Sequence, residues 1–75
     1  MAKREVNREA LRAIRELVGV EQSDLAIRCG ITQGHLSNIE IGKRAPSPSV
    51  LRALADQLGV SLDAISRAVP EPVSA

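Results

Sequence analysis

The stretch Gln22–Ile41, QSDLAIRCGITQGHLSNIEI, decides the fold of this chain. Its apolar residues recur at the three- and four-residue spacing that places side chains on one face of a helix. The residues of these faces are Leu25, Ala26 and Cys29 in the first half and Leu36 and Ile39 in the second. The spacing predicts two short helices, over residues 22–29 and 33–41, with a tight turn between them.

The turn has residue types that suit two closely packed helices. Gly30 stands where the chain reverses, and a glycine accepts the positive φ that such a turn needs. Ile31 follows as an apolar plug for the core, and Thr32 is a good N-cap for the second helix. Two helices joined in this way form a helix-turn-helix. The second helix then presents short polar or small residues outward: Gln33, Gly34, His35, Ser37 and Asn38.

The rest of the chain predicts three more helices and no strand. One begins near the candidate cap Asn7 or extends upstream through Arg4 and Glu5. Another follows Ser47, and a short one follows Ser61. Their apolar positions are Ala10, Leu11, Ile14, Leu17 and Val18; Leu51, Leu54, Ala55 and Leu58; and Leu62 and Ile65. The predicted fold is therefore all-α, with five helices in a compact domain.

At 75 residues the chain is long enough for one domain only. We expect a basic leader over residues 1–6, the helical domain over residues 7–68 and a flexible tail over residues 69–75. The tail contains two prolines and cannot continue as a helix. The basic residues Lys3, Arg4 and Arg8 are either a solvated leader or an arm that reaches backbone phosphates.

Composition argues against several functions. The chain has no Phe, Tyr or Trp, which excludes base-stacking platforms and aromatic cages. One Cys and one His provide neither a disulfide nor a structural metal set, so we expect no metal and no cofactor. No apolar run is long enough for a membrane span, and the charged start does not fit a signal peptide. No catalytic constellation or phosphate loop is present either, and we expect a cytoplasmic protein without enzyme activity.

The charges are unevenly distributed although their sum is only +1. Residues 1–15 carry +3, residues 16–27 carry −3, residues 28–52 carry +3 and residues 53–75 carry −2. Arg outnumbers Lys eight to two, which suits phosphate and base-edge contacts but is also what a GC-rich genome would give. The pattern predicts a surface with one basic and one acidic side.

About three-quarters of the chain, from Leu11 to Ile65, resembles the lambda-repressor-like, or xenobiotic-response-element type, DNA-binding domain. The matching features are LRAIREL, Gln22, LA in the second helix, the GIT turn, LSNIE, GKRAPS and LRALADQLGVSLDAI. The resemblance implies a sequence-specific regulator that binds the major groove of double-stranded DNA.

The resemblance also implies a role for individual residues. Bases would be read by Gln33, Gly34, His35, Ser37 and Asn38, and phosphates would be bound by Gln22, Thr32, Lys43 and Arg44. Arg15 and Glu40 match a family pair that ties the first helix to the recognition helix. A homodimer would use Leu62, Ile65 and Val69, and no small-molecule ligand is evident.

Some positions depart from the family pattern. Glu21 replaces the usual Ser, Thr or Asn cap of the second helix, and Gly34 has no side chain where relatives often read a base. Gly34 therefore either removes a specificity contact or permits a close approach of the backbone. Cys29 is read as a small core residue. Ile27 is apolar on an outward face, so it is either an ordinary exposed side chain or a contact for a protein partner.

The predicted function is that of a small phage-type or mobile-element repressor, acting as a dimer on a pseudo-palindromic operator. A restriction-modification controller and an antitoxin-like autoregulator are alternatives within the same class. A helix-turn-helix module that binds a protein through Ile27 is the alternative of another class.

Overall fold

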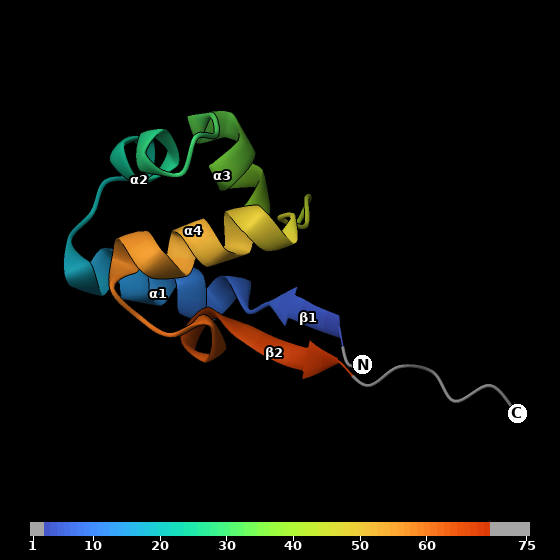
Figure 1. The fold of residues 1–75 in the computed structure, drawn as a ribbon. Coiled ribbons are helices and arrows are strands. Elements are labelled where there is room, and N and C mark those ends of the chain that lie inside the picture. Colours follow the sequence, from blue (N-terminus) through green and yellow to red (C-terminus); the bar gives the residue numbers. More distant parts are fainter. Residues whose placement is uncertain (1–2, 70–75) are drawn as a thin grey trace, which may run out of the picture.

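A computed structural model describes residues 3–69 of the chain. Its elements, in chain order, are β1 (Lys3–Val6), α1 (Arg8–Val18), α2 (Gln22–Arg28), α3 (Gln33–Glu40), α4 (Pro48–Leu58), the 3₁₀ helix η1 (Leu62–Ile65) and β2 (Ser66–Val69). In Figure 1, α1 and α4 lie side by side, and α2 and α3 lie together above them. The two strands extend from the helices toward the lower right.

Side-chain caps explain where three of the helices begin. Asn7 Oδ1 accepts a hydrogen bond from Ala10 N at 3.1 Å, at the start of α1. Thr32 and Ser47 cap α3 and α4 in the same way, at 3.0 and 3.3 Å. Each such cap stabilises a helix by about 1 kcal/mol, because it satisfies a backbone N–H that the helix itself leaves free. The start of α2 has no such bond, since Glu21 does not cap it.

An aliphatic core holds the elements together. Its largest fully buried side chains come from all four α-helices and from η1: Leu11, Leu25, Leu36, Ile39, Leu54 and Ile65. Half-buried residues such as Ile14, Ile31 and Cys29 pack against this cluster. Desolvation raises the pKa of the Cys29 thiol, which disfavours the reactive thiolate at neutral pH. Branched aliphatic residues from five elements thus fill the interior without an aromatic ring.

The prediction of five helices and no strand is wrong for the ends of the described chain. The segment after Ser61 forms only the 3₁₀ helix η1, and the chain continues as β2. Strand β2 pairs antiparallel with β1, with Val6 opposite Ser66 and Lys3 opposite Val69. The fold is therefore mostly α, with four α-helices, one 3₁₀ helix and a two-stranded sheet among residues 3–69.

The sheet is attached to the helical body by polar contacts. Asn7 N donates to Ile65 O of η1 at 2.8 Å, and Ser66 Oγ donates to Leu62 O of η1 at 2.5 Å. Within the sheet, Arg4 Nε donates to Ser66 Oγ at 3.0 Å. Arg4 also pairs with Asp63. The segment expected as a leader over residues 1–6 thus contains β1. The expected tail begins with the last residue of β2, and residues 70–75 lie outside the described residues.

Two residues predicted for the core face of α1 are exposed. Leu17 is 87% exposed and Val18 is 51% exposed. At about 100° per residue, Leu17 lies roughly 120° around the helix from Leu11, which faces the core. Val18 lies on the core side but at the last residue of the helix. The apolar stripe in the sequence is therefore wider than the face that the core covers.

Within residues 3–69, none of the helices has the length and apolar character needed to cross a bilayer. The same residues contain no group of three or more His, Cys, Asp or Glu side chains arranged to hold a metal ion.

Leu54→Ala and Leu17→Ala should differ sharply in stability, although the substitution is the same. Leu54 is fully buried in α4, so the cavity should lower the free energy of unfolding by about 2–5 kcal/mol. Leu17→Ala should change it by less than about 0.5 kcal/mol. Urea unfolding followed by far-ultraviolet circular dichroism measures both, and a comparable loss of stability in the two variants would contradict the described packing of α1.

Candidate nucleic-acid interface

Helices α2 and α3 pack against each other through a turn of four residues. Leu25 and Ala26 of α2 and Leu36 of α3 are fully buried between the helices and the core. Gly30 has a φ of +73°, and Ile31 N donates to Ala26 O at 3.0 Å. A side chain at Gly30 would strain this turn, because residues with a Cβ rarely adopt that φ. The turn thus fixes the direction in which α3 leaves α2.

The outward face of α3 carries the five residues predicted to read bases. Gln33 and Gly34 are exposed, while His35, Ser37 and Asn38 are half-buried. A Cβ placed on Gly34 would meet no atom within 4 Å, so the space above this position is open. The structure therefore presents a shallow polar surface, lowest at Gly34, along the first half of the helix.

The first residues of α2 and α3 lie next to each other. Gln33 Nε2 approaches Gln22 Oε1 at 3.5 Å, at the long limit for a hydrogen bond. Thr32 is exposed, and its hydroxyl oxygen accepts the His35 N–H. Both helix N-termini therefore open onto the same surface, where free backbone N–H groups favour an anion.

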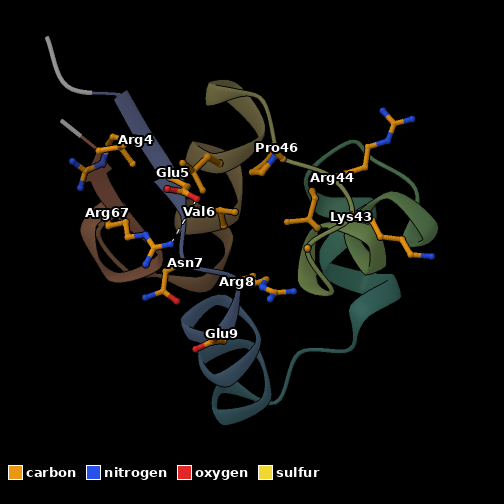
Figure 2. A pocket seen from close by; sticks show the side chains of 15 residues that line it. Arg4, Glu5, Val6, Asn7, Arg8, Glu9, Lys43, Arg44, Pro46 and Arg67 are labelled. Atoms are coloured by element: carbon orange, nitrogen blue, oxygen red, sulfur yellow. Dashed lines mark ion pairs between the residues drawn. The ribbon is translucent and has the colours of Figure 1, made fainter. Parts of the chain in front are cut away.

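Two cations follow α3. Lys43 and Arg44 are exposed, and their backbone N–H groups both donate to Asn38 O, at 2.8 and 3.1 Å. Figure 2 shows the two side chains projecting away from the strand β1. The basic residues are thus held at the C-terminal end of α3 by its own last turn.

A buried ion pair connects α3 to α1. Arg15 Nε and Nη2 donate to the two carboxylate oxygens of Glu40, at 2.8 and 3.0 Å. The remaining nitrogen, Nη1, donates to Val20 O at 3.1 Å. The side chains of Arg15 and Glu40 are only 13% and 3% exposed. The hydrogen bond to Glu40 raises the pKa of Arg15, while burial acts in the opposite direction, so the guanidinium stays charged at every physiological pH.

The residues predicted for a dimer interface do not share one environment. Ile65 is fully buried in the core, so its side chain is not available to a second copy. Leu62 and Val69 are half-buried. Ile27, the candidate contact for a protein partner, is 75% exposed on α2. Burial of Ile65 therefore leaves only Leu62 and Val69 of the predicted interface residues available to a second copy.

Two N-terminal arginines have separate roles that the sequence does not reveal. Arg4 and Arg8 are both expected as part of a leader or an arm, but their side chains bond to different elements. Arg4 binds Asp63 and Ser66 beside the sheet, whereas Arg8 Nη1 donates to Ile41 O at the end of α3. Both contacts join segments more than thirty residues apart, and local periodicity carries no signal for them.

Comparison with known proteins agrees with this geometry. A family model described as helix-turn-helix matches residues 11–65. An uncharacterized HTH-type transcriptional regulator of Bacillus subtilis, YazB, is 38% identical over 56 residues, which cover 75% of this chain and 81% of that protein.

Solved structures show the same similarity. The restriction-modification controller protein C.AhdI from Aeromonas hydrophila superposes with a TM-score of 0.73 at 26% identity, over 76% of this chain and 86% of that one. The P22 c2 repressor, solved in complex with a synthetic operator, gives 0.72 at 28% identity, over 77% and 88%. The gene regulator ClgR from C. glutamicum gives 0.70 at 32% identity, over 75% and 73%.

Glu40→Gln should destabilise the fold far more than Glu16→Gln. Glu40 neutralises a largely buried arginine, so its replacement should lower the free energy of unfolding by about 3–5 kcal/mol. Glu16 pairs with Arg12 on the exposed side of α1, and the same change there should cost about 0.5 kcal/mol or less. Urea unfolding of both variants makes the comparison. Equal destabilisation would show that the Arg15–Glu40 pair does not hold α3 to α1.

Proposed function

Since the chain belongs to the lambda-repressor-like helix-turn-helix family, we propose that it is a sequence-specific regulator of transcription that binds double-stranded DNA. The observation that supports this most is the polar face of α3, which includes the exposed Gln33 and Gly34 and is bounded by two helix N-termini and two cations. A helix of this kind fits the major groove of B-DNA.

In this proposal α3 is the recognition helix. Gln33 is exposed at its first turn, where its amide can donate to and accept from the edge of an adenine. His35, Ser37 and Asn38 provide further polar contacts along the same groove. Gly34 lets the backbone of α3 come close to the bases, because nothing projects from it. His35, Ser37 and Asn38 are half-buried, so their side chains extend only a short way from α3. Base contacts by these residues therefore require the helix to lie deep in the major groove.

Phosphate contacts frame the recognition helix in the same proposal. Gln22 and Thr32 stand at the N-termini of α2 and α3. Their side chains and the backbone N–H groups there bind the phosphates of one DNA strand. Lys43 and Arg44 bind phosphates beyond the other end of α3. These contacts fix the register of the helix in the groove but are indifferent to sequence.

We propose a homodimer on a pseudo-palindromic operator, since one such module covers only about half a turn of the major groove. With Ile65 buried, Leu62 and Val69 are the remaining candidates for the contact between subunits. Among subtypes, a small repressor is our proposal, supported by the similarity to the P22 c2 repressor. The similarity to C.AhdI supports the alternative of a restriction-modification controller.

A protein-interaction module is the second candidate function. It rests on Ile27, which is 75% exposed on α2, next to an acidic segment of the sequence. Selection of bound duplexes from a random library separates the two. Enrichment of one sequence supports the regulator, whereas no enriched duplex favours the interaction module.

Gln33→Ala and Lys43→Ala should weaken DNA binding in different ways. Gln33→Ala should relax the preference at one base pair by about 1–3 kcal/mol, because it removes a base-edge contact. Lys43→Ala should weaken all sequences alike and make the slope of log K against log salt shallower by about 0.9, because one phosphate is no longer neutralised. Titration of the selected duplex and its single-base variants, at several salt concentrations, measures both. An unchanged preference in Gln33→Ala would refute the assignment of α3.

Gly34→Ala should separate stability from binding. The open space above Gly34 accepts a methyl group, and alanine is the better helix former by at most about 1 kcal/mol at this second residue of α3, so the variant should unfold at higher urea. Its affinity for the selected duplex should nevertheless fall by about tenfold, as expected for overpacking a close contact. If the variant binds as tightly as the original chain, the backbone of α3 does not approach the bases at this position.

A further inference from the structure

Arg8, the first residue of α1, connects this helix to the C-terminal end of α3. Its Nη1 donates to Ile41 O at 2.5 Å. The contact borders a cleft of 740 Å³ that separates β1 and the start of α1 from the loop after α3. Figure 2 shows the Arg8 side chain pointing across this cleft toward the side on which Lys43 lies. The Arg8 side chain thus crosses from the start of α1 to Ile41, the C-cap residue of α3.

The end of α3 needs a partner of this kind. The last carbonyls of a helix have no partner within it. Backbone N–H groups of the following loop serve Asn38 O and Ile39 O, but among the described residues the hydrogen bond to Ile41 O comes from Arg8. The last turn of α3 also contains no basic residue that could offset the negative end of its dipole. Arg8 supplies the donor for Ile41 O, and it adds a positive charge at this end to those of Lys43 and Arg44 in the loop that follows.

The same arginine is poorly placed for its own helix. A cation in the first turn of α1 opposes the positive end of that helix dipole. The side chain turns away from this end and carries its charge to the negative end of α3. The position of Arg8 is therefore unfavourable for α1 alone and favourable for the junction of α1 with α3.

Gly42 leaves room for this contact. It has a φ of +85°, and a Cβ there would overlap the guanidinium of Arg8. The guanidinium is the far end of a flexible side chain, so a side chain at position 42 would displace it and break its bond to Ile41 O. Gly42 thus serves both the left-handed turn after α3 and the passage of Arg8.

From these contacts we propose that Arg8 is a positioning residue: it fixes the end of α3, and with it the loop that carries Lys43 and Arg44, to the N-terminus of α1. The effect on DNA binding rests on the function proposed above, but the effect on the loop does not. Arg8 acts here through Ile41 and does not itself contact a phosphate.

Amide hydrogen exchange of the free protein tests the effect on the loop. Arg8→Ala should speed exchange at the amides of Gly42, Lys43 and Arg44 by about threefold to tenfold, as expected when an exposed hydrogen bond from a charged donor is removed. Arg12→Ala is the matched control, because it removes the same charge from the exposed side of α1 and should leave these amides unchanged. Equal exchange in the two variants would overturn the proposal.

A second variant tests whether faster exchange in Arg8→Ala comes from the lost contact or only from the lost charge. Apart from glycine, Asn is among the residues that best tolerate a left-handed backbone, so Gly42→Asn keeps the turn but displaces the Arg8 side chain. It should speed exchange at Lys43 and Arg44 as Arg8→Ala does, and combining the two should add little. Fully additive effects would show that Gly42 and Arg8 act independently, which contradicts the proposal.

DNA binding separates positioning from direct contact. With the duplex selected by the original chain, Arg8→Ala should lower affinity while the slope of log K against log salt stays the same. A slope reduced by about 0.9 would identify Arg8 as a phosphate ligand and overturn the proposal. If no duplex is selected at all, the proposed regulator function fails, and the exchange measurements still decide the role of Arg8.

Discussion

The placement of α3 depends on the ion pair between Arg15 and Glu40. Helix α3 is eight residues long, too short to be stable alone in water. Leu36 and Ile39 hold its inner face by burial, but the hydrophobic effect is non-directional and by itself leaves the end of the helix some freedom to rotate or slide. The two parallel hydrogen bonds from Arg15 have a fixed fork geometry and remove this freedom. Because both charges are largely buried, neither can leave the pair without a large cost in desolvation.

Other contacts hold the two ends of α3 in place. Gly30 and Ile31 set the start of α3 by shaping the turn from α2, and Thr32 caps its first N–H groups. The ion pair fixes the last turn, and Arg8 closes the end beyond it. The outward face is consequently rigid at both ends, although none of its own residues contributes to the core. A surface of this kind can accept a ligand without first paying to order itself.

Much of this arrangement could be predicted from the sequence. The helix boundaries follow from capping residues such as Asn7, Thr32 and Ser47, which signal locally. The turn follows from Gly30, and the family resemblance supplied the pairing of Arg15 with Glu40. What was missed is non-local. The strands have four residues each and little apolar alternation, so they are invisible until residues 3–6 and 66–69 are brought together. Leu17 was misplaced because apolar spacing defines a stripe without showing how much of it another element covers.

The small sheet has a consequence for the order in which the domain assembles. Its two strands are separated by nearly the whole described chain, so pairing them early would require closing a very long loop. The helices and the turn between α2 and α3 form from nearby residues and shorten that distance first. We therefore expect the ladder to close late and to be able to open again without breaking the Arg15–Glu40 pair, because both residues lie between the two strands in the sequence and in neither of them. In that order of assembly, the strands add a last contact between the two ends of a helical body that has already formed.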